Sequence, residues 1–88
     1  MSKKYKMYSD AGHGWLAVKR SELIELGLIG KISHYSYQRG QTVYLEEDCD
    51  ASLFFNFYTN RYNKQVEVEF KHTNNTSPIR SYESFSTR

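Results

Sequence analysis

The sequence predicts an α+β domain with a single, mainly antiparallel sheet and two helices packed on one face of it. Three observations support this fold class. Short apolar or alternating runs, bounded by turn residues, are typical of strands. Two segments carry apolar residues at helical spacing. The elements follow in the order β-β-α-β-β-α-β, which implies one sheet with mainly antiparallel pairing.

Composition places the chain among small globular domains. Its 88 residues suffice for one domain but leave little room for a deep active site. The net charge of +2 is weaker than the field of a dedicated DNA-binding protein. The single cysteine, Cys49, rules out an internal disulfide, and no apolar run approaches the roughly 18 residues of a membrane span. We therefore expect a soluble protein of a reducing cytoplasm with no membrane partner.

The first part of the chain predicts a hairpin followed by a short helix. Lys4–Tyr8 alternates charged and apolar residues, and Trp15–Val18 is apolar, so the two segments should pair as strands. The helix should begin with Ser21 as its N-cap and end with Gly27 at the C′ position. Leu28 then supplies the apolar residue of a Schellman-type stop.

A second hairpin is predicted next, and its side-chain pattern allows two loop lengths. A two-residue loop would pair Tyr37 with Tyr44 and mix polar and apolar residues on both faces. A three-residue loop ending at Gly40 would pair Tyr35 with Val43. It would place the polar and apolar side chains on opposite faces, so we prefer it. The preferred loop puts four side chains on the core face: Tyr35, Tyr37, Val43 and Leu45.

A second helix is expected over Ala51–Tyr62, capped by Asp48 or Asp50. Its apolar residues recur in two rows, Leu53 with Phe57 and Phe54 with Tyr58, which marks it as the main core helix.

The last regular segment, Gln65–Lys71, alternates strictly and predicts a half-buried strand. Its core-facing residues should be Val66, Val68 and Phe70. Residues 73–88 are rich in Asn, Thr, Ser and Arg and predict a flexible tail after a single domain at 1–72. The possible anchors of this tail are Ile79, Tyr82 and Phe85.

Four acids before and at the start of the second helix form a first candidate binding surface: Glu46, Glu47, Asp48 and Asp50. They are too contiguous for an EF-hand loop, and we expect neither a metal nor a cofactor. Capping and solvation explain some of them. The functional alternative is a negative patch that meets a basic surface on a partner protein.

A second candidate surface combines residues of the loops and the hairpin: His13, His34, Arg39 and Tyr44. Aromatic and basic groups together can stack nucleic-acid bases, but the preferred loop leaves only His34, Arg39 and Tyr44 of the hairpin exposed, so we assign this surface to a partner protein. His13 lies between two glycines and could act as a base, although an exposed turn explains it more simply. Cys49 has no local signature of a catalytic cysteine, and no phosphate-loop, paired-cysteine or zinc-protease motif occurs. We therefore expect no enzyme.

Residues 10–54 resemble a family of small proteins of tailed phages and prophages. The matching segments are Gly12–Leu16 with Val18, Glu22-Leu23, Leu26-Gly27, Lys31–Ser33, Tyr35–Gly40 and Val43–Asp50. The resemblance implies a phage or prophage accessory protein and supplies no catalytic residue. The region from Gln65 onward has no counterpart in that family.

The leading hypothesis is a non-enzymatic phage accessory protein that binds a host or antiphage-defence protein and inhibits it at fixed stoichiometry. The eight tyrosines favour it, because they exceed what a small core needs and exposed tyrosine is favoured at interfaces. The first alternative is a nucleic-acid-binding regulator, and an enzyme is the third possibility.

Overall fold

The computed structural model describes residues 4–87. Their elements, in chain order, are β1 (Lys4–Ser9), β2 (Gly14–Lys19), α1 (Arg20–Glu25), β3 (Tyr37–Arg39), β4 (Thr42–Glu46), α2 (Asp50–Tyr62), β5 (Glu67–His72), the 3-10 helix η1 (Pro78–Ser81) and β6 (Glu83–Ser84). None of the helices in this part of the chain is long and apolar enough to cross a membrane.

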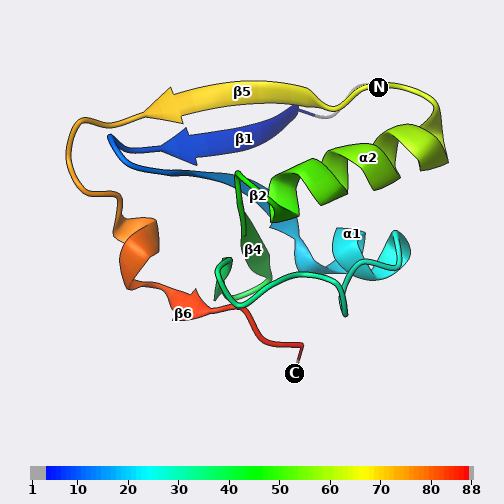
Figure 1. The fold of residues 1–88 in the computed structure, drawn as a ribbon, viewed down its shortest axis with the longest axis horizontal. Helices are drawn as coiled ribbons and strands as arrows, with labels where there is room; N and C mark the ends of the chain where they lie inside the picture. The colour runs from blue at the N-terminus through cyan, green and yellow to red at the C-terminus, as the bar shows by residue number, and fades with distance from the viewer. Residues whose placement is uncertain (1–3, 88) are drawn as a thin grey trace.

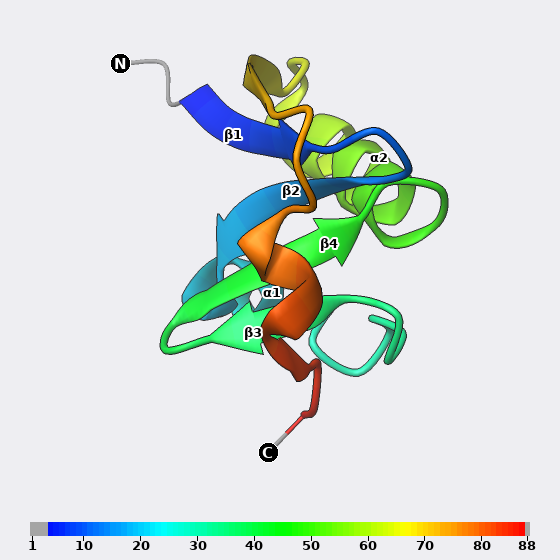
Figure 2. The ribbon, with the colours of Figure 1, turned by 90° about the vertical axis from the view of Figure 1, so that its left-hand side faces the viewer.

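The strands form one six-stranded sheet in the order β5-β1-β2-β4-β3-β6. All neighbours pair antiparallel except β1 and β5, which run parallel. Helices α1 and α2 lie on one side of the sheet and η1 lies on the other (Figures 1 and 2). The predicted fold class, with a mainly antiparallel sheet and two helices on one face, is confirmed.

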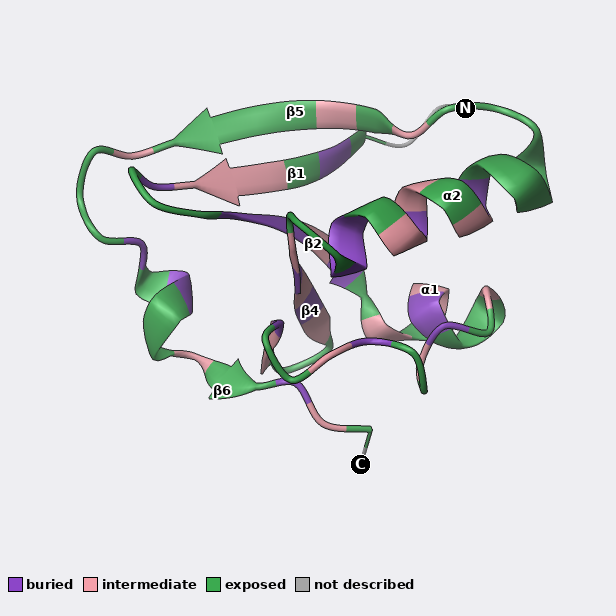
Figure 3. Cartoon of the chain, in the orientation of Figure 1, coloured by how far each residue is buried: buried purple, intermediate pink, exposed green. Residues whose placement is uncertain are grey.

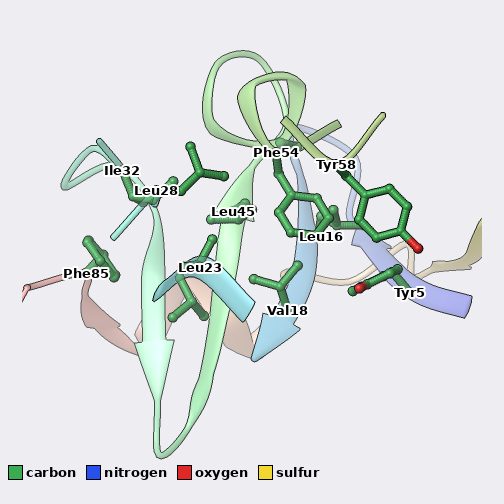
Figure 4. Packing of buried hydrophobic residues seen from close by; sticks show 12 residues of the cluster. Tyr5, Leu16, Val18, Leu23, Leu28, Ile32, Leu45, Phe54, Tyr58 and Phe85 are labelled. Atoms are coloured by element: carbon green, nitrogen blue, oxygen red, sulfur yellow. The ribbon is translucent and has the colours of Figure 1, made fainter. Parts of the chain in front are cut away.

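The main core lies between the sheet and the two helices (Figure 4). Its fully buried apolar side chains include Leu16, Leu23, Leu45 and Phe54. On α2 the buried row is Phe54 and Tyr58, whereas the row of Leu53 and Phe57 is half-buried at the margin. The Tyr5 ring from β1 packs edge-on against Phe54 with 5.3 Å between centroids. Five elements, β1, β2, α1, β4 and α2, therefore meet in one cluster.

The predicted end of α1 is confirmed, whereas its start differs. Gly27 has φ +74°, and the Leu28 N–H donates to a carbonyl of the last helical turn at 2.7 Å, which is the Schellman geometry. The N-cap is Lys19 rather than Ser21. The helix begins earlier because the Glu22 carboxylate accepts a bond from the Lys19 N–H at 2.7 Å.

Strands β3 and β4 are joined by a two-residue loop, so the preferred three-residue loop is wrong. Tyr37 lies opposite Tyr44, and Gly40 opens the loop with φ +59°. A positive φ at the first loop position alone is the pattern of a type II′ turn. Tyr35 precedes β3 and is 68% exposed, and Tyr37 faces away from the helices. Of the four predicted residues, two belong to the core: Val43 and Leu45.

The loop prediction failed because it assumed that only one face of the hairpin is covered. The segment from η1 onward covers part of the opposite face (Figure 2), so aromatic residues pack on both faces. Ser36 is also fully buried, although it is not among the four side chains predicted for the core face. Its hydroxyl donates to Asp50 at 2.5 Å and accepts from the Glu46 N–H at 2.9 Å, which offsets the loss of water.

Residues 73–87 are built into the domain, where the sequence predicts a flexible tail. β6 pairs with β3, and the Phe85 N–H donates to the Ser36 carbonyl at 2.8 Å. Ile79 and Phe85 are buried and Tyr82 is half-buried. The Arg20 guanidinium lies 5.2 Å from the centre of the Phe85 ring. The domain therefore extends beyond the predicted boundary at residue 72.

Strand β5 is an edge of the sheet, and Figure 3 shows that it is almost entirely exposed. Val66 and Val68 are half-buried, but Phe70 is 75% exposed. The prediction of a core position for Phe70 is wrong because the outermost strand extends past the area that α2 covers.

Candidate functional site

A cleft of about 330 Å³ lies on the sheet face opposite the helices. Its lining residues are His13, Trp15, Tyr35, Tyr37, Glu46, Asp48, Cys49 and Arg80. We call it the aromatic–acidic cleft. It unites parts of both candidate surfaces, since His13 comes from one and Glu46 and Asp48 come from the other.

An ion pair between Asp10 and Arg80 holds one wall of this cleft. The Arg80 Nε and Nη2 atoms lie 2.6 and 2.9 Å from the two carboxylate oxygens. The same carboxylate accepts bonds from the backbone N–H groups of Gly12, His13 and Ser77, each at 3.0 Å. Arg80 first, and then these backbone donors, hold the pKa of Asp10 well below its usual range. Asp10 thereby ties the β1–β2 loop to the start of η1.

Trp15 forms the floor of the cleft and is 3% exposed. The Arg80 guanidinium lies 5.4 Å from the centre of its ring, within the range of a cation–π contact. Tyr37 packs edge-on against Trp15 at 6.3 Å between centroids. The wall and floor are therefore rigid, because Asp10 fixes the arginine that lies over the tryptophan.

The rim of the cleft is more open. Tyr35 is exposed, and its ring stacks on His34 at 4.5 Å between centroids. Asp48 and Cys49 are exposed on the other side. A rigid aromatic floor and wall thus meet a rim with one exposed tyrosine and one free carboxylate.

The four predicted acids do not form one exposed patch, because Asp50 is buried at 3% exposure. One of its carboxylate oxygens accepts bonds from the Ser33 N–H at 3.0 Å, the Ser33 hydroxyl at 2.7 Å and the Ser36 hydroxyl at 2.5 Å. Asp50 therefore fixes the loop before β3 to the start of α2, and its assignment to a partner-facing patch is corrected.

Glu46 also has a structural role, since its half-buried carboxylate accepts bonds from the backbone N–H groups of Asp48 and Cys49 at 2.9 and 3.1 Å. The N-cap of α2 is Cys49, and neither Asp48 nor Asp50 caps the helix as predicted. The exposed acidic side chains of this segment are Glu47 and Asp48.

Arg39 and Tyr44 belong to a different surface. Arg39 lies 5.1 Å from the centre of the Tyr82 ring and donates to its hydroxyl at 3.2 Å. Tyr44 packs on Tyr82 at 5.2 Å and on Tyr8 at 6.2 Å between centroids. Burial, followed by the neighbouring Tyr82, raises the pKa of Tyr44. A groove of about 510 Å³ beside these rings is lined in part by Tyr8, Tyr44, Tyr82 and Lys71, and we call it the tyrosine groove.

Cys49 and His13 line the same cleft, but no hydrogen bond joins them in the part of the chain that the structure describes. Within residues 4–87, no three His, Cys, Asp or Glu side chains are grouped to hold a metal ion.

Sequence reasoning missed Asp10 and Arg80. A local signal for Asp10 exists, because an aspartate often accepts bonds from the N–H groups two and three residues on. Arg80 carries no such signal, since its contacts come from residues distant in the sequence.

No protein-family model matches the chain, and comparisons with curated proteins and with solved structures find no match either. The fold and the site define a class of protein: a small α+β domain with an aromatic–acidic cleft on the sheet face opposite its helices.

Proposed function

We propose that this chain is a phage accessory protein that binds a host or antiphage-defence protein and inhibits it at fixed stoichiometry, without catalysis. The observation that supports binding is the aromatic–acidic cleft. Its floor and walls are formed by Trp15, Tyr37 and Arg80. Tryptophan, tyrosine and arginine are the residue types enriched among the residues that contribute most binding energy at protein interfaces. The phage setting rests on the resemblance of residues 10–54 to small phage proteins.

The chemistry of the rim suggests what the partner presents. Tyr35 offers an exposed ring, and Asp48 with the neighbouring Glu47 offers negative charge. A partner segment with an apolar residue beside a lysine or arginine complements both. The apolar part packs on Tyr35 while the cation pairs with Asp48, and the charge contributes mainly to specificity and association rate.

The test begins with capture of partners from a bacterial host lysate, followed by titration with the purified partner. We expect Tyr35→Ala to weaken binding about tenfold or more, equivalent to about 1–2 kcal/mol, because it removes an aromatic contact. Glu47→Lys with Asp48→Lys should also weaken binding and change its salt dependence. Ile24→Ala is the matched control, since Ile24 is 58% exposed on α1 across the sheet.

Stoichiometry separates a binder from an enzyme. For a binder, inhibition of the partner saturates near a fixed molar ratio and survives Cys49→Ser. Equal binding by the Tyr35→Ala variant and the wild type contradicts the cleft as the contact site. Full inhibition at strongly substoichiometric amounts, abolished by Cys49→Ser in a folded protein, contradicts the non-catalytic proposal.

The tyrosine groove favours a second candidate function, binding of single-stranded nucleic acid. Tyrosine rings beside Lys71 and Arg39 provide stacking surfaces and positive charge. Mobility-shift titration with a single-stranded oligonucleotide tests this directly. Binding that weakens with salt and is lost in both Tyr82→Ala and Lys71→Ala supports it, and an absence of binding at low salt rejects it.

A further inference from the structure

The outer edge of β5 is open to pairing. β5 is the last strand in the sheet order, and no other described strand lies beyond it (Figure 1). The Thr73 N–H donates to the Ser9 carbonyl of β1 at 3.0 Å. Because backbone groups alternate along a strand, those of Lys71 and Glu69 also face β1. The outward-facing N–H and C=O groups then belong to Val68, Phe70 and His72.

Within residues 4–87, this edge carries only one of the usual protections against pairing, its charged side chains. Natural edge strands are kept apart by charged side chains, proline, bulges, a covering loop or very short length. β5 has six residues and no proline, and Phe70 exposes 75% of its surface. A groove of about 610 Å³ runs beside the same edge and is lined by Phe55, Val66 and Val68 together with polar residues of α2. Apolar side chains of β5 and α2 therefore lie near the open backbone groups, among polar ones.

We propose that β5 pairs antiparallel with β5 of a second copy of this chain, so that two six-stranded sheets become one continuous sheet in a two-fold symmetric dimer.

The charges on β5 select one register for this pairing. In an antiparallel pair of identical strands, a two-fold axis passes through the centre of the pairing. Two residues that lie opposite each other are equally far along the sequence from the residue at that centre. A centre at Glu69 or at Lys71 puts that residue opposite its own copy, and a centre at Val68 puts Glu67 opposite the partner's Glu69. Like charges directly opposite one another are destabilising. A centre at Phe70 instead puts Glu69 opposite the partner's Lys71, and symmetry makes this pair twice.

The hydrogen-bonding pattern of the outward-facing N–H and C=O groups is also compatible with the register centred at Phe70. The outward groups of Phe70 meet those of the partner's Phe70 as a hydrogen-bonded pair, and Val68 meets the partner's His72 in the same way. Glu69 and the partner's Lys71 then occupy the non-hydrogen-bonded position, where side chains are closest. Within one chain Glu69 and Lys71 already approach at 3.1 Å, with 46% and 49% of their side chains exposed. Both are therefore free to exchange partners across the dimer.

Light scattering coupled to gel filtration tests the dimer over a dilution series. At high concentration we expect the wild type at twice the 10.4 kDa mass of one chain. Glu69→Lys and Lys71→Glu should each shift the protein to the monomer mass, because each places like charges opposite one another. The equimolar mixture of these two variants should recover the dimer, since every opposite pair in the mixed dimer is complementary. Glu67→Lys is the matched control on the same face and should still dimerise.

Circular dichroism establishes that each variant is folded. A wild type that stays at the monomer mass at every concentration overturns the proposal. Dimers that persist in the Glu69→Lys variant, or a mixture of the two variants that remains monomeric, also overturn it, because the interface then lies elsewhere or uses another register.

Amide hydrogen exchange gives a second readout that does not depend on charge. In the dimer the Phe70 amide should exchange slowly, and in the monomeric variants it should exchange fast. The Lys71 amide faces β1 and should remain protected in both. Fast exchange at Phe70 in a sample of dimer mass would place the contact away from β5 and overturn the proposal.

Discussion

Ser36 is a single residue on which three segments of the chain converge. It is fully buried, donates to Asp50 and accepts from the Glu46 N–H, while its carbonyl accepts from the Phe85 N–H. These bonds join the loop before β3 to the start of α2, the end of β4 and the segment after β6. The position is therefore specified by hydrogen bonds rather than by apolar burial.

We expect Ser36→Ala to destabilise the fold by about 1–3 kcal/mol, because it leaves the part-buried Glu46 N–H without its acceptor and removes a donor from the buried Asp50. Urea denaturation followed by circular dichroism measures the change. Ser81→Ala, at an exposed serine, is the control and should remain within about 0.5 kcal/mol of the wild type. Equal stability of the two variants would contradict a structural role for the Ser36 hydroxyl.

The lowered pKa of the Asp10 carboxyl group predicts that the stability of the fold depends on pH. Its pKa is lower in the folded state than in the unfolded chain, so the unfolded state binds the proton more readily. The stabilisation is complete above the ordinary aspartate pKa of about 3.9 and is lost progressively as the pH falls below it. Asp10→Asn should therefore be less stable than the wild type at pH 7 and should lose less stability on acidification.

Thermal denaturation over a pH series measures this difference. Asp48→Asn changes an exposed carboxyl group and serves as the control. Wild-type and Asp10→Asn curves that run parallel into acid would show that the Asp10–Arg80 pair does not contribute to stability in solution.

At the scale of elements, α2 presents two apolar rows, and only one faces the sheet. Phe54→Ala should reduce the free energy of unfolding by about 3–5 kcal/mol, since Phe54 is fully buried. Phe57→Ala should cost clearly less because Phe57 is half-buried. Chemical denaturation of both variants tests the rotation of the helix, and a larger loss at Phe57 would contradict it.

The elements show which local signals determine structure. Gly27 and Leu28 specify the stop of α1 through backbone geometry within one turn, so that boundary could be predicted. The loop at Gly40 could not, because both lengths satisfy the local turn rules and the choice depends on what covers the second face of the sheet. The row of α2 that faces the core was equally undetermined, since aromatic residues occupy both rows.

At the scale of the whole molecule, the site was only partly predictable for the same reason. His13 and Asp48 could be named as candidates, and the fold brings both to one cleft. Arg80, which completes the wall, lies in a segment whose polar composition predicts disorder, and it is ordered by contacts with Asp10 and Trp15. Long-range partners of this kind leave no periodic trace in a single sequence.

The order of strands has a consequence for folding kinetics. β1 to β4 lie in the centre of the sheet, and both edges are supplied by residues 67–84, with Lys4 paired to Glu67 and Tyr37 paired to Ser84. Such non-local pairing requires large loops to close first, so we expect refolding to be slower than the microsecond-to-millisecond range of helical bundles. Whenever β5 and β6 are undocked, the central strands present two bare edges, so we expect loss of these two strands to be the route by which the chain aggregates.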